Sequence, residues 1–233
     1  MFSLTKIWCL LLPAILAACL FVDRPLSRVL YDLNCPQTIA SCAGCENWPP
    51  FVREPQKPCS SQGLLGRMVE LGGLMTGLAA PLLLLAALLL PPGRGRDLVI
   101  LTGVSILVTF VLKNDLKWVF GRYWPITWTN GNPSWITDQA YGFHWFHGNF
   151  LQGEEGTGSF PSGHTAMAFA VLLPYGLFHR KALPVLLLLA SSVGILLVLL
   201  DYHFLSDVLA GALLGMTCPM LLQRLLIGGR HPG

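Results

Sequence analysis

The chain has 233 residues, of which 53% are hydrophobic and only 12% are charged, and its mean hydropathy is +0.59. An ordinary soluble domain has roughly 25% charged residues, so much of this chain must face lipid. The net charge of +3 is small and dispersed, and no run of Lys and Arg is interleaved with a stacking surface. This composition argues against a nucleic-acid partner.

Apolar stretches with few charges recur along the chain, each close to the ~20 residues that a helix needs to cross the hydrocarbon core. They predict an all-α integral membrane protein that forms one domain over residues 1–233, with six transmembrane helices and two long extracytoplasmic loops. The fourth span is short and can extend at either end. The predicted spans are Ile7–Val22, Met68–Leu90, Leu98–Leu116, His164–Leu177, Leu183–Leu200 and Val208–Ile227.

The short linkers predict the orientation, because Lys and Arg are retained on the cytoplasmic side. Arg94 and Arg96 follow the second span, and Arg180 and Lys181 follow the fourth. We therefore expect both termini in the cytoplasm, as in a bacterial inner membrane protein. The first outer loop also contains basic residues, which by themselves would favour the opposite orientation. Long loops, however, influence orientation less than short ones. The basic residues of this first outer loop are Arg24, Arg28, Arg53, Lys57 and Arg67.

The first apolar segment has an alternative interpretation as a cleaved signal sequence. Leu16-Ala17-Ala18-Cys19 resembles a bacterial lipoprotein cleavage site. However, Lys6 alone is a weak positive region before the segment, and a retained helix makes the charge pattern consistent. We favour the retained helix.

The first outer loop, residues 23–66, is rich in proline, which disfavours a long regular helix. It also contains four cysteines, which in an extracytoplasmic loop indicate disulfides with three possible pairings. A zinc site made of the same cysteines is the alternative, because two of them have the spacing of zinc ligands. The four are Cys35, Cys42, Cys45 and Cys59.

The second outer loop, residues 121–159, is dense in aromatic side chains. Such rings suit the headgroup region of a membrane, so the loop is either an interfacial belt or a lid that contacts substrate. The rings belong to Trp124, Trp128, Trp135, Tyr141, Phe143, Trp145, Phe146 and Phe150.

Three polar clusters interrupt the apolar pattern, at residues 117–125, 161–164 and 203–207. All three fall at predicted outer ends of helices, within the segment 117–215. Ionisable groups at membrane depth are costly and usually mark function. We therefore expect the chemistry of the protein in this segment.

The segment Phe160-Pro161-Ser162-Gly163-His164-Thr165 opens the fourth predicted span. Pro suits the first turn of a helix, and Gly allows close approach to the backbone. Unpaired amides at a helix start form a site for phosphate, and His164 is placed to donate a proton. The alternative is an ordinary helix cap with a solvent-facing His.

His203 and Asp207 are four residues apart, which on a helix puts them on one face. A carboxylate there can fix the imidazole tautomer and stabilise the imidazolium. The alternative makes Ser206 or Asp207 a helix N-cap.

Together these residues resemble the type 2 phosphatidic acid phosphatase (PAP2) superfamily of membrane phosphatases. The resemblance rests on Pro161-Ser162-Gly163-His164, on His203 to Asp207, and on the following Val208-Leu209-Ala210-Gly211. Two positions depart from the family pattern: Trp124 stands where its first motif has Arg, and Leu197 where its third motif has Arg. The usual pair of phosphate-clamping arginines is therefore incomplete. Lys113 is a candidate replacement cation.

The resemblance implies a two-step hydrolysis that needs no metal or other cofactor. His203 would attack phosphorus to form a phosphohistidine, Asp207 would orient it, and His164 would serve as acid and then base. Phosphoryl oxygens would be held by the remaining predicted site residues. These are Lys117, Arg122 and the backbone of Ser162 and Gly163.

The sequence thus predicts an extracytoplasmic phosphatase that acts on a lipid phosphate or diphosphate at the periplasmic or exterior face. Its expected partners are this substrate and the surrounding membrane lipids, while its oligomeric state stays open. One alternative is a lipid phosphotransferase that uses the same intermediate. The other is a non-catalytic membrane protein that binds anionic lipid, motivated by Trp124 and Leu197.

Overall fold

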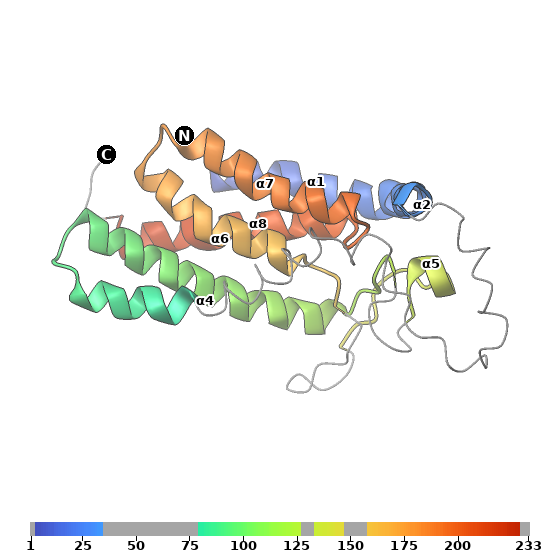
Figure 1. The fold of residues 1–233 in the computed structure, drawn as a ribbon, viewed down its shortest axis with the longest axis horizontal. Coiled ribbons are helices and arrows are strands. Elements are labelled where there is room, and N and C mark those ends of the chain that lie inside the picture. The colour runs from blue at the N-terminus through green and yellow to red at the C-terminus, as the bar shows by residue number, and fades with distance from the viewer. Residues whose placement is uncertain (1–2, 35–78, 127–132, 147–157, 229–233) are drawn as a thin grey trace.

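The computed structural model describes residues 3–34, 79–126, 133–146 and 158–228. These residues form helices that run roughly along one axis, with the N- and C-termini at the same end (Figure 1). In the described ranges the only strand-like pairing is a pair of isolated β-bridges. The expectation of an all-α fold is confirmed.

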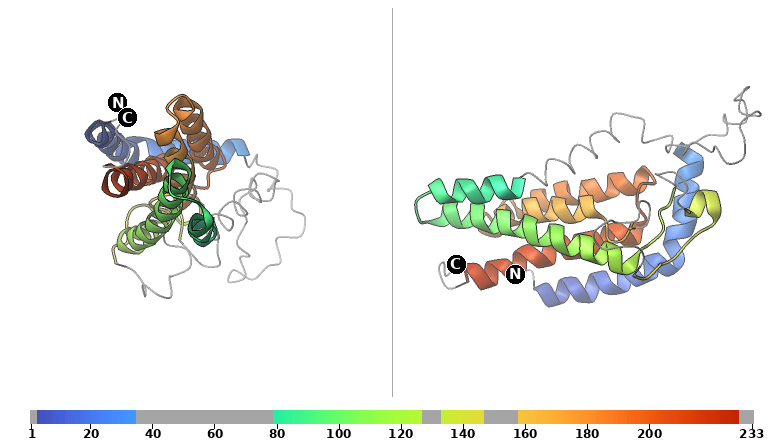
Figure 2. Two further views of the ribbon diagram at one scale, coloured as in Figure 1. Left: turned by 90° about the vertical axis from the view of Figure 1, so that its left-hand side faces the viewer. Right: turned by 90° about the horizontal axis from the view of Figure 1, so that it is seen from below.

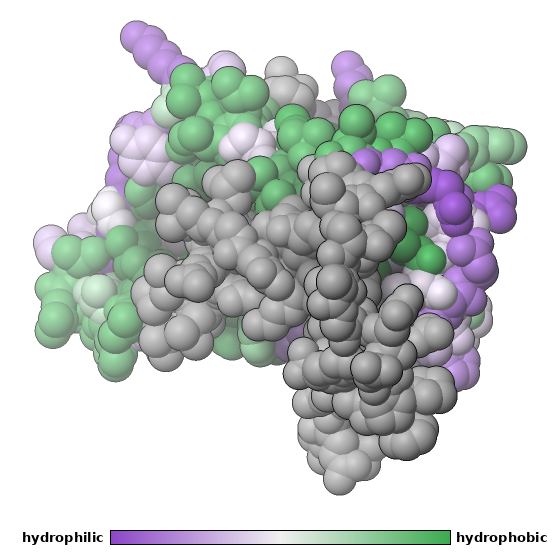
Figure 3. Space-filling model, turned by 45° about the vertical axis from the view of Figure 1, so that its right-hand side comes forward, coloured by the Kyte–Doolittle hydropathy of each residue, from purple (hydrophilic) through white to green (hydrophobic). Residues whose placement is uncertain are grey.

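Among the described residues, three helical runs are long and apolar enough to cross a membrane by themselves: Leu4–Leu33, Arg94–Phe120 and Leu205–Leu226. Shorter apolar helices cover Ala79–Leu89, Gly163–Phe178 and Leu183–Leu199. Apolar side chains also cover much of the surface that is not grey in Figure 3. The chain is therefore an integral membrane protein. The count of six spans stays a prediction, and its second span is described only from Ala79 onward.

The first helical run extends further than the sequence predicted. Helix α1 (Leu4–Ala17) continues through the π-helical turn η1 (Ala18–Val22) into α2 (Asp23–Asn34). The expectation that residue 23 begins an irregular loop was therefore wrong for its first twelve residues. Pro25 lies just after the π-helical turn, a local adjustment that accommodates proline within a membrane helix, and Asp23 is buried against an arginine from a distant segment.

Helix α2 is seen end-on in Figure 1 and turns away from the axis of α1 in Figure 2. Arg24 lies 5.9 Å and Arg28 5.6 Å from the ring of Trp135, which begins the short helix α5 (Trp135–Asp138). These cation–π contacts hold α2 against the second loop.

Helix α4 (Arg94–Phe120) includes the predicted span Leu98–Leu116 and extends beyond it at both ends. It ends at Gly121, which adopts a left-handed conformation with φ 50° and donates its N–H to the Lys117 carbonyl at 2.8 Å. The chain then reverses through bridges that pair Arg122 with Phe143 and Trp124 with Ser134. This reversal turns the segment after α4 back over the end of the bundle.

Helices α6 (Gly163–Phe178), α7 (Leu183–Leu199) and α8 (Leu205–Leu226) pack closely through glycines. A Cβ at Gly211 would collide with the Ser162 carbonyl oxygen, and one at Gly215 with the Ala166 carbonyl oxygen. Small residues of this kind let membrane helices approach each other. The close approach brings the start of α6 next to the start of α8.

The four cysteines of the first loop lie outside the described residues, so neither the disulfide nor the zinc prediction is tested. The cysteines that are described, Cys9, Cys19 and Cys218, are free thiols.

Candidate active site

The start of α6 meets the start of α8 through a direct hydrogen bond. The Ser162 amide donates to the Asp207 carbonyl oxygen at 2.9 Å, and the Ser162 hydroxyl caps α6 by accepting from the Thr165 amide at 3.5 Å. The two motifs are far apart in sequence but form one site. Ser162 itself is occupied by these structural contacts, which differs from the prediction that its backbone binds phosphate.

Two lysines of α4 pack against Gly163, the first residue of α6. A Cβ on Gly163 would stand 3.3 Å from Cδ of Lys113 and 3.7 Å from Cε of Lys117. Glycine thus makes room for both lysine stems. Lys113, the candidate replacement cation, lies as close to the motif as Lys117 does. The Lys117 ammonium also donates to the Gly158 carbonyl.

Asp207 holds the imidazole of His203 at the start of α8. Its Oδ2 lies 3.4 Å from Nδ1 of His203, accepts from the Ser159 hydroxyl, and accepts from the Phe204 amide at 3.1 Å. His203 is only 2% exposed. Burial lowers the pKa of His203 below its ordinary value, although Asp207 acts in the opposite direction. The arrangement leaves Nε2 of a neutral imidazole for chemistry.

Arg122 lies behind this pair and connects it to the first helical run. Its guanidinium has no exposed surface, and it donates to Asp23 at 2.7 Å, to Asp207 and Ser206, and to the Tyr141 hydroxyl at 2.9 Å. Desolvation opposes its charge, but the carboxylates of Asp207 and Asp23 more than compensate, so the pKa of Arg122 is raised. This geometry differs from the prediction that Arg122 binds phosphate, because two carboxylates already occupy its fork.

Asp23 also caps α8 from a distant part of the chain. Its Oδ1 accepts from the Ser206 amide at 3.0 Å, and its Oδ2 accepts from the Ser206 hydroxyl. A carboxylate at a helix start is favoured by the unpaired amides and the dipole there. Asp23 thereby fixes the first turn of α8, which carries Asp207.

The two positions that depart from the family pattern have defined surroundings. The Trp124 ring lies 4.9 Å from the His203 ring and 5.3 Å from the Lys117 ammonium. Leu197 is fully buried, and its carbonyl accepts from the amides of Tyr202 at 2.9 Å and His203 at 3.2 Å. Trp124 therefore lies beside the imidazole of His203, and Leu197 fixes the turn before that residue.

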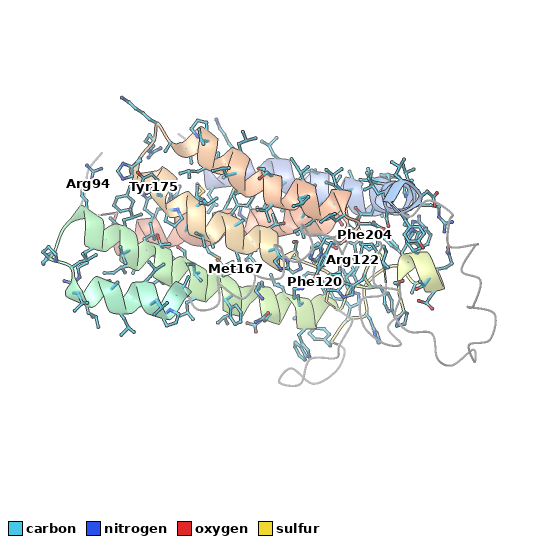
Figure 4. The ribbon with its side chains drawn as sticks, viewed as in Figure 1. Arg94, Phe120, Arg122, Met167, Tyr175 and Phe204 are labelled. Atoms are coloured by element: carbon cyan, nitrogen blue, oxygen red, sulfur yellow. The ribbon has the colours of Figure 1, made fainter. Side chains whose placement is uncertain are left out.

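His164 and His203 both contact the ring of Tyr202. The Tyr202 ring is 5.8 Å from the His164 ring and 5.4 Å from the His203 ring, measured between centroids. His164 is partly exposed, whereas His203 is buried. The structure thus brings the two predicted catalytic histidines to the same end of the bundle, where Arg122 and Phe204 are labelled in Figure 4.

Sequence reasoning missed several contributors to the site. Asp23 carried a usable signal, since a carboxylate next to an apolar span is costly and indicates a partner. Tyr202 adjoins His203 in the chain and could have been included. Ser159 carried no motif that distinguishes it from other loop serines.

Comparison with known proteins identifies the same family that the two motifs resemble. Residues 98–226, more than half of the chain, match the model of the PAP2 superfamily. This chain belongs to that superfamily. The match includes both histidine motifs and the lysines of α4, and it supports assignment as a membrane phosphatase.

Two similar proteins extend this comparison. The bacitracin transport permease protein BcrC of Bacillus licheniformis is 45% identical over 58 residues, which cover 25% of this chain and 29% of that protein. The fold resembles the crystal structure of a transmembrane PAP2 type phosphatidylglycerolphosphate phosphatase from Bacillus subtilis, with a TM-score of 0.50, 18% identity, and coverage of 97% of this chain and 96% of that one. This second likeness concerns the fold alone.

Proposed function

We propose that this PAP2 protein hydrolyses a lipid phosphate or diphosphate through a phosphohistidine at His203. The hydrogen bond from the Ser162 amide to the Asp207 carbonyl, 2.9 Å long, carries the proposal because it joins the two motifs into one site. The lysines against Gly163 supply the positive charge that a phosphate group needs.

In the first step, Nε2 of His203 attacks phosphorus and the bond from phosphorus to the ester oxygen breaks. His164 gives a proton to the departing oxygen. Asp207 orients the ring through Nδ1 and stabilises the positive charge that develops on it. The lipid alcohol, or lipid monophosphate, leaves with that proton.

In the second step, water attacks the phosphohistidine and His164 accepts its proton. The bond between phosphorus and Nε2 breaks, and inorganic phosphate leaves. Lys113, Lys117 and the Gly163 amide at the start of α6 hold the phosphoryl oxygens in both steps. Neither step requires a metal ion, since the charge of the phosphoryl group is balanced by lysines and a helix start.

The proposed orientation puts this site on the extracytoplasmic face. Arg94 lies at the end of the bundle opposite Arg122 and Phe204 in Figure 4, and Arg180 follows α6 at the same remote end. Basic residues in short linkers are retained in the cytoplasm, so the site belongs on the other side. We further propose the bacterial inner membrane as the location.

The test is phosphate release by purified protein in detergent with chelator, using phosphatidate, phosphatidylglycerol phosphate and a polyprenyl diphosphate as substrates. His203→Ala should abolish release. His179→Ala is the matched control, because His179 is exposed just after α6 at the remote end, and it should retain wild-type release. No release from any substrate by folded wild-type protein would refute the proposal.

A further inference from the structure

A cavity lies at the end of the bundle remote from His203. It has a volume of about 80 Å³ and is lined by side chains from α1, α6, α7 and α8. This is about half the volume of an engineered cavity of about 150 Å³ that binds benzene. The cavity therefore has room for a short segment of a lipid acyl chain. Its apolar lining includes Ile7, Leu177, Leu183, Leu187, Met216 and Met220.

Two arginines also line this cavity. Arg180 follows α6, and Arg224 lies in the last turn of α8. Both are exposed, and neither forms an ion pair within the part of the chain that the structure describes. Gln223 lines the cavity beside them and adds a neutral hydrogen-bonding group.

This combination matches one class of ligand. An apolar chain alone would gain nothing from two guanidinium groups, and a soluble anion would gain nothing from six aliphatic side chains. An anionic phospholipid has both parts, and a membrane supplies it at high local concentration. Guanidinium groups are also suited to phosphate because they donate two parallel hydrogen bonds.

We propose that this cavity binds an anionic phospholipid from the leaflet at the remote end of the bundle. A segment of one acyl chain occupies the cavity, and the phosphate lies between Arg180 and Arg224. This lipid is bound, not hydrolysed, because His203 adjoins Phe204, which is labelled at the opposite end of the bundle from Tyr175 (Figure 4). The bound lipid ties α1 to α6 and α7 across α8.

The test is lipid retention measured by native mass spectrometry of purified protein after addition of phosphatidylglycerol or phosphatidylcholine. Wild-type protein should retain phosphatidylglycerol preferentially. The double variant Arg180→Gln, Arg224→Gln should lose that preference by about ten-fold or more. Lys181→Gln is the matched control, because Lys181 is an exposed cation in the same linker that does not line the cavity, and it should keep the preference.

A second variant tests the apolar part. Leu177→Trp fills the cavity and should reduce retention of phosphatidylglycerol while Arg180 and Arg224 remain. Equal retention of the two lipids by wild type would overturn the proposal, as would equal losses in the arginine and lysine variants. Phosphate release, measured in parallel, should be unchanged in all these variants. If wild type releases no phosphate, the retention comparison still stands.

Discussion

Asp23 and Arg122 are 99 residues apart in sequence and form an ion pair 2.7 Å long in which neither side chain has exposed surface. The pair connects the first helical run to the segment after α4, and Arg122 continues the connection to Asp207. Forming a buried ion pair costs desolvation energy, so the pair adds little net stability. Removing one partner is destabilising, because the other charge is left buried without it. Here Arg122 also pairs with Asp207, the carboxylate that faces His203.

Asp23→Asn should destabilise the protein, but by less than the about 3–5 kcal/mol of a fully unpaired buried charge, because Arg122 still pairs with Asp207. Phosphate release should fall as well, since the first turn of α8 loses its charged cap. The measurements are thermal unfolding in detergent and release at matched folding. Asp32→Asn, an exposed change on the same helix, is the control. Equal stability of the two variants would show that the pair contributes nothing.

Leu197→Arg should reduce stability and should not raise turnover, although it restores the residue typical of the family. Leu197 has no exposed surface and packs against Val208, so an arginine there would bury a charge without a described partner. Leu197→Met conserves volume and should cost less than about 1.5 kcal/mol. Unfolding midpoints and phosphate release of both variants decide this. A stable, faster Leu197→Arg enzyme would mean that the site is missing a cation.

Asp201 predicts a pH dependence of stability. It is 2% exposed, and burial raises its pKa from the ordinary value of 3.8 to about 8, which Ser27 only partly offsets. The folded state therefore binds this proton more tightly than the unfolded state, and stability should fall as pH rises from 4 to 8. The slope is at most about 1.4 kcal/mol per pH unit. Asp201→Asn should flatten this profile in unfolding measurements, and an unchanged slope would exclude Asp201 as the cause.

The ring of Trp124 should help to hold the imidazole of His203 in position. Trp124→Phe keeps an aromatic contact with His203 and should retain most activity, whereas Trp124→Ala should slow release by about two- to ten-fold. That range corresponds to the roughly 0.5–1.5 kcal/mol of an aromatic pair. The rate constants at saturating substrate give the comparison. Equal rates for wild type and Trp124→Ala would make Trp124 an interfacial anchor only.

The sequence predicted the motifs of the site better than their partners. Pro161 to His164 and His203 to Asp207 were found as short polar motifs, but the reason given for the second was wrong: α8 begins at Leu205, so His203 meets Asp207 from the turn before the helix. The role of Arg122 was not predictable, because chain position near a motif does not reveal that Asp23 neutralises it from 99 residues away. The same ion pair buries Asp23 within the first helical run, where the proline-rich sequence had indicated an irregular loop.

The most direct test of the account is the chemical identity of the covalent intermediate. Rapid quenching of the protein with a labelled lipid phosphate should trap phosphate on His203, in a bond that is labile to acid and stable to base. His164→Ala should accumulate more of this species from a substrate with a good leaving group, because water activation is slowed. Phosphate on another residue, or turnover by His203→Ala at the wild-type rate, would contradict the account.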